Sequence, residues 1–126
     1  MFILNSEQTS EETAPIVVIQ DTIVPINQLF DINVDSFEVI QSTIKKNEFL
    51  ANILLPYNID YAIIGALAKK SKSIFDVRRI AVGQDYTLLI SKDSLQKAAY
   101  FIYEIDAVDY VVYDLRDSIE IVRKKR

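Results

Sequence analysis

Two apolar stripes at helical spacing, separated by a proline, constrain the fold of this chain more than any other feature. The members of the first stripe, which fall on one side of a short helix, are Phe49, Leu50, Ile53, Leu54 and Tyr57. Asn47 is placed to cap the amino end of this helix, and Pro56 ends it. The segment predicts a helix that is buried on one face and needs a second layer to cover it.

A second helix is predicted to start at Asp60, which stands at an N-cap position. Its apolar stripe consists of Ile63, Ile64, Leu67 and Ala68. Lys69, Lys70 and Lys72 follow at the carboxyl end, where cations interact favourably with the helix dipole. Gly65 in the middle costs about 1 kcal/mol relative to alanine. We therefore expect Gly65 to mark a close contact between the two helices.

Apolar and alternating runs on both sides of the helices predict β-strands. The strand before the helices is expected at 36–45, with an irregularity near 40–42. The strands after the helices are expected at 86–90, 98–105, 110–115 and 119–122. Short polar turns separate the last three, which indicates an antiparallel β-meander. The fold class is therefore α+β, and tyrosines in these strands are interpreted as sheet packing in preference to a platform for sugars.

Charge is divided unevenly along the chain. Residues 1–41 carry seven acids and no base, whereas the remainder carries all 14 bases and 11 acids. We interpret 1–35 as a disordered or extended acidic leader, 36–91 as a strand-helix-helix-strand unit and 92–122 as a β-meander extension. The basic run 123–126 is interpreted as a linker toward a missing downstream domain.

The chain contains neither histidine nor cysteine. Imidazole is the usual general base and the commonest zinc ligand, so a hydrolytic triad of the usual kind, a histidine zinc site and a thiol nucleophile are all excluded. No apolar run approaches the roughly 20 residues that span a bilayer, and no recognition helix accompanies the bases. We therefore expect no catalytic residue, no metal or other cofactor, no nucleic-acid partner and no transmembrane segment in this chain.

Several segments, taken in order, resemble a known family. They are 44–50 with 54–58, 69–72 with 75–80, 80–88, and 93–97 with 103–104. Together they resemble the N-terminal, LysM-like (opacity-associated-protein-like) non-catalytic region of Gram-negative, Bacteroidetes-like lysostaphin-type zinc endopeptidases that cleave peptidoglycan. The resemblance covers about residues 30–122 and implies a LysM-like strand-helix-helix-strand unit. It also implies that zinc belongs only to a downstream catalytic domain and that the protein works in the periplasm or cell envelope.

The resemblance further implies two functional surfaces. A groove for glycan would be lined by Lys46, Asn47, Glu48 and Phe49 on one side and Phe75, Asp76, Val77 and Arg78 on the other. A basic surface for docking onto a catalytic domain would add Lys45, Lys69, Lys70, Lys72 and Arg79. The expected partners are peptidoglycan, the catalytic domain of the same protein, or both.

Three functions remain open on the sequence. The first is a regulatory or cell-wall-targeting module that occludes or positions the catalytic domain of a peptidoglycan zinc endopeptidase. The second is a stand-alone LysM-like protein that binds peptidoglycan glycan. The third is an assembly module that pairs a β-strand edge with a partner.

Overall fold

The computed structural model describes residues 27–126 and divides the chain into two units, Met1–Ile32 and Asn33–Arg126. Strand β1 (Gln28–Leu29) pairs with β2 (Ile32–Asn33). The turn residues Phe30 and Asp31 both have positive φ, 53° and 65°, which is the type I′ geometry typical of two-residue hairpins. Of the leader expected at 1–35, residues 1–26 lie outside the described residues. Residues 27–35 contain this hairpin.

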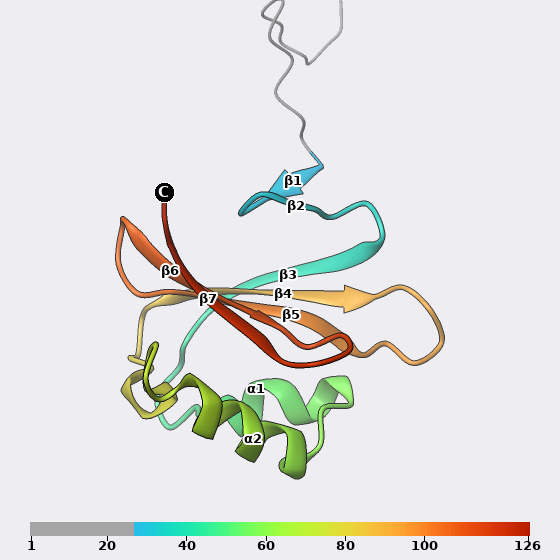
Figure 1. The fold of residues 1–126 in the computed structure, drawn as a ribbon. Helices are drawn as coiled ribbons and strands as arrows, with labels where there is room; N and C mark the ends of the chain where they lie inside the picture. The colour runs from blue at the N-terminus through green and yellow to red at the C-terminus, as the bar shows by residue number, and fades with distance from the viewer. Residues whose placement is uncertain (1–26) are drawn as a thin grey trace, which may run out of the picture. The chain divides into compact units, whose positions relative to one another are not determined.

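One antiparallel sheet forms the centre of the second unit, and both helices lie against one of its faces (Figure 1). Its strands, in spatial order, are β3 (Phe37–Thr43), β4 (Asp85–Ser91), β5 (Ala98–Glu104), β6 (Asp109–Asp114) and β7 (Glu120–Lys125). The spatial order follows the chain order, so β3 and β7 are the edges. The α+β fold, with its strand-helix-helix-strand unit and meander, is confirmed. Residues 36–91 and 92–122 both contribute strands to this sheet.

The register of the sheet differs from the sequence prediction in one place. β3 pairs with β4 without a break from Phe37 opposite Ser91 to Thr43 opposite Asp85, so the irregularity expected near 40–42 is absent. The shift instead lies between β4 and β5, where Leu89 faces Tyr100 and Ile90 faces Ala98. Ala99 is therefore the extra residue of a β-bulge.

The helical segment between β3 and β4 contains α1 (Leu50–Leu54), the 3₁₀ turn η2 (Leu55–Tyr57), α2 (Tyr61–Ser71) and the 3₁₀ turn η3 (Val77–Arg79). Asp60 caps α2 as predicted, since its Oδ1 accepts the N–H of Ile63 at 3.0 Å. Apart from Phe49, the apolar residues that the periodicity selected are buried or half-buried, with Leu54 and Leu67 fully buried.

The start of α1 and the role of Gly65 were predicted wrongly. Asn47 has φ 63° and does not cap the helix; the residue before α1 is Phe49, whose N–H donates to Asn52 Oδ1 at 2.8 Å. Phe49 has an extended backbone conformation, lies outside the helical stripe and is 68% exposed. Gly65 is exposed, and a Cβ added there meets nothing within 4 Å, so it makes no close helix contact.

The hydrophobic core lies between the helices and the sheet, and it is built around Leu54, Leu67, Phe101 and Tyr113, all fully buried. Strands β4, β5 and β6 are buried on both faces over most of their length. Four tyrosines of the meander are buried, which agrees with packing in the sheet: Tyr100, Tyr103, Tyr110 and Tyr113.

The basic run at the carboxyl end is largely part of the sheet. β7 extends to Lys125 and pairs with β6 up to that residue, so residues 123–125 do not form a separate linker. Within the described part of the chain, no helix is long and apolar enough to cross a membrane.

Candidate binding groove and basic surface

The first side of the expected groove is the turn between β3 and α1. Glu48 closes this turn: its N–H donates to the Lys45 carbonyl and its carboxylate accepts the Lys45 N–H, both at 3.0 Å. Lys46 and Asn47 are exposed at the tip of the turn, and Phe49 follows them at the surface. Glu48 therefore holds the turn in shape, while its neighbours are exposed to solvent.

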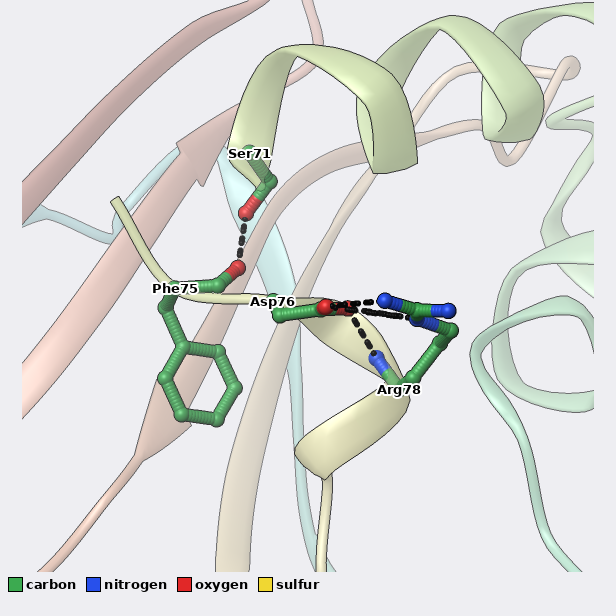
Figure 2. A network of polar contacts seen from close by, with 4 residues as sticks. All are labelled: Ser71, Phe75, Asp76 and Arg78. Atoms are coloured by element: carbon green, nitrogen blue, oxygen red, sulfur yellow. Dashed lines mark hydrogen bonds and ion pairs between the residues drawn. The ribbon is translucent and has the colours of Figure 1, made fainter. Parts of the chain in front are cut away.

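The second side follows α2 and is held by the network in Figure 2. Ser71 Oγ donates to the Phe75 carbonyl at 2.5 Å, which ties the segment after the helix to the last helical turn. The Phe75 ring packs against Tyr103, with ring centres 5.2 Å apart. Phe75 and Val77 both pack against the core cluster and are only half-buried. These two residues mainly anchor the segment to the core, and only part of each is exposed to solvent.

Asp76 and Arg78 form an ion pair at the start of η3. The Asp76 carboxylate caps the turn by accepting the Arg78 N–H at 3.0 Å, and it accepts Arg78 Nε and Nη2 at 3.1 and 2.7 Å (Figure 2). These side-chain and backbone hydrogen bonds lower the pKa of Asp76 to about 2, with a smaller contribution from Lys72. Asp76 is thus a fixed anion with no proton to donate near neutral pH, and Arg78 already has a partner.

Residues next in the chain to the two sides are hydrogen-bonded to each other through the backbone. Ile44 donates its N–H to the Gln84 carbonyl and accepts the Gly83 N–H, each at 2.8 Å, which brings the turn after β3 beside the turn before β4. Among residues 27–126, no hydrogen bond or ion pair joins 46–49 directly to 75–78.

A cavity of about 580 Å³ lies beside η3 and was not predicted. Phe75 and Arg79 line it together with residues of the β5–β6 hairpin. Gln84 closes one wall, since its Nε2 donates to the Glu104 and Ile105 carbonyls at 3.1 and 2.6 Å. These segments are far apart in sequence and a side-chain amide holds them together, which no spacing pattern could reveal.

The basic residues divide into two groups. Lys45, Lys70 and Arg78 are engaged within the chain: Lys45 Nζ bonds Ser42 Oγ at 3.1 Å, and Lys70 Nζ donates to the Ile119 carbonyl. In the other group the side chains are exposed and make no hydrogen bond or ion pair within residues 27–126; its members are Lys46, Lys69, Lys72 and Arg79. We call this second group the free basic group. No three histidine, cysteine, aspartate or glutamate residues in the same range are grouped to hold a metal.

No family model matches the sequence, and no curated protein matches it. The fold is similar to a solved crystal structure of a zinc-containing peptidase from Vibrio cholerae, with a TM-score of 0.57 and 17% sequence identity. The match covers 69% of this chain and 27% of the peptidase chain. About two thirds of this chain therefore shares its fold with part of a zinc-containing peptidase, and the match spans about a quarter of that protein's length.

Proposed function

We propose that this chain is a non-catalytic, LysM-like module of a zinc endopeptidase that cleaves peptidoglycan in the periplasm or cell envelope, and that the module occludes or positions the catalytic domain. The observation that carries the proposal is the similarity of its fold to part of a zinc peptidase chain. The composition agrees with a non-catalytic part, since a chain without histidine lacks the usual zinc ligand and the usual general base. Zinc would be held by a separate catalytic domain.

The free basic group supplies the chemistry for docking. Lys69, Lys72 and Arg79 lie at the end of α2 and in η3, and none of them makes an ion pair within the described residues. Such cations can steer and hold an acidic surface, and the attraction weakens as salt screens it over about 8 Å at physiological ionic strength. Arg78 is a poor choice for testing this contact, because reversing its charge would also place a second carboxylate beside Asp76.

The test uses the full-length protein and measures basal cleavage of purified peptidoglycan crosslinks at low and high salt. The triple reversal of Lys69, Lys72 and Arg79 to Glu should raise basal activity at low salt while leaving the module folded. A control reversal of Lys97 and Lys125, which lie in the β4–β5 loop and at the end of β7, should leave activity unchanged. Equal activity of both variants and the wild type would reject docking through this surface.

A chelator experiment distinguishes the activity of the isolated module from that of the full-length protein. The isolated chain should neither bind zinc specifically nor clear a suspension of cell walls. The full-length protein should clear it, and a chelator should abolish this activity. Chelator-sensitive clearance by the isolated chain would reject the assignment as a non-catalytic part.

Glycan binding is a second candidate, and the exposure of Phe49 favours it. Phe49, which is 68% exposed and follows Lys46 and Asn47 in the turn, offers an aromatic ring for stacking against a sugar at the first side of the groove. Tyr61 provides a matched control, since it is 71% exposed at the start of α2. In a pull-down with insoluble peptidoglycan, Phe49→Ala should reduce binding whereas Tyr61→Ala should not. Equal retention of both variants would leave the regulatory role as the better account.

A further inference from the structure

The outer edge of β3 has no strand beside it among residues 27–126, and Figure 1 shows it at the margin of the sheet. The direction of its backbone groups follows from Ile44, the next residue, whose N–H donates to the Gln84 carbonyl on the β4 side. Successive residues of a strand point these groups to opposite sides. The N–H and C=O groups of Val39, Gln41 and Thr43 therefore point away from β4.

The two edges of the sheet differ in their protection against strand addition. β7 ends in three consecutive cations, and its Arg123 is paired with Asp109. β3 has no proline, no lysine and no break in register, and Glu38 is its only charged residue. Natural edge strands commonly carry lysines, prolines or bulges that discourage pairing. β3 is the edge that lacks these features.

We propose that β3 pairs antiparallel with β3 of a second copy of this chain, in a register centred on Ile40. Val39 and Gln41 then exchange backbone hydrogen bonds with Gln41 and Val39 of the second copy, and the two five-stranded sheets become continuous. Ile40 faces its own symmetry mate. Because β3 forms part of the sheet and Val39 is 37% exposed, β3 enters this contact in the extended conformation that it already has.

Charge complementarity selects this register. Lys45 Nζ lies 3.1 Å from Ser42 Oγ and 3.4 Å from the Thr43 carbonyl oxygen, so the ammonium sits beside Ser42 at the outer edge of β3. With Ile40 at the centre, Glu38 of one copy stands opposite Ser42 of the other, and its carboxylate meets the Lys45 ammonium; symmetry gives two such pairs. A slip of two residues in either direction would place Glu38 opposite Ile40 or Ile44 and would lose both ion pairs.

The first experiment measures self-association of the 126-residue chain by sedimentation equilibrium over a concentration series. Glu38→Lys and Lys45→Glu should each lower the association constant at least tenfold, and the charge-swapped double variant should restore it. Glu120→Lys on the other edge is the matched control and should leave association unchanged. A chain that stays monomeric at millimolar concentration, or single variants that associate as the wild type does, would overturn the proposal.

The second experiment reads the register and uses the absence of native cysteine. In the proposed pairing, Ile40 and its symmetry mate form a non-hydrogen-bonded pair with Cα atoms about 4.5 Å apart, within the roughly 4.4–6.8 Å that a disulfide spans. Ile40→Cys should therefore give a covalent dimer under mild oxidation, whereas Val122→Cys on β7 should not. Equal crosslinking of the two variants would reject the β3 pairing, and circular dichroism would show that both are folded.

Discussion

Removing the hydroxyl of Ser71 should destabilise the protein by about 2 to 4 kcal/mol, which is large for the loss of one oxygen. Ser71 is fully buried, and its Oγ donates to the Phe75 carbonyl at 2.5 Å and accepts the Tyr113 hydroxyl at 2.9 Å. Ser71→Ala leaves the buried Tyr113 hydroxyl without its partner, which costs about 1 to 3 kcal/mol, and loses the bond to Phe75, worth about 1 kcal/mol.

The assay is urea unfolding of the chain, with the free energy of unfolding extrapolated to water. Tyr113→Phe should cost only about 1 kcal/mol, because Ser71 keeps its bond to Phe75. The loss in the double variant should be about 1 kcal/mol smaller than the sum of the two single losses, since no buried hydroxyl is then left without a partner. Ser73→Ala, at an exposed serine two residues on, should change stability by less than about 0.5 kcal/mol. Strictly additive losses would refute the interaction between the two hydroxyls.

Four other changes test the fold. Leu54→Ala removes a fully buried core side chain and should lower the free energy of unfolding by about 2 to 5 kcal/mol in urea; an unchanged midpoint would contradict its place in the core. Gly65→Ala should stabilise the chain by about 0.5 to 1 kcal/mol in the same assay, since the added methyl meets nothing; a loss would show a hidden contact. Arg78→Ala should raise the pKa of Asp76 toward its ordinary value of 3.8 in an NMR titration, and a pKa that stays near 2 would mean that other groups hold it. Burial raises the pKa of Tyr113 from 10.0 to about 12, so the unfolded state loses this proton first and stability should fall as pH rises from 10 to 12; a Tyr113→Phe variant with the same fall would contradict this cause.

The fold could be predicted where one pattern repeats along an element. Leu50, Ile53 and Leu54 in α1 and Ile64 and Leu67 in α2 are all buried, because helical spacing fixes which side chains share a face. The residue at which a helix starts depends instead on which single side chain accepts the first free backbone N–H groups. Asn52, inside the helix, accepts the N–H of Phe49, so the helix starts later than a cap at Asn47 would place it, and the Phe49 ring is left outside the stripe.

The candidate site could be predicted less well, because its contacts are not periodic. The pairing of Asp76 with Arg78 spans two residues in a 3₁₀ turn, a spacing at which residues of an α-helix do not face each other. The hydrogen bonds from Gln84 to the Glu104 and Ile105 carbonyls join segments that are distant in sequence and close only in the folded structure. The sequence identified cations near both sides of the groove, but only the three-dimensional contacts distinguish those already engaged from the free basic group.

The position of β3 in the chain has a consequence for how the protein folds. Residues 92–97, 105–108 and 115–119 connect successive strands from β4 to β7, whereas 44–84 lie between β3 and β4. Closing the long segment costs more chain entropy than closing the short turns, and contacts distant in sequence form slowly. The meander can therefore assemble from local hairpins, and β3 with its helices completes the sheet as the late, cooperative step. A second copy that binds β3 only when the sheet is complete would stabilise the folded state by mass action. Association and folding of this module should therefore be linked through this one strand.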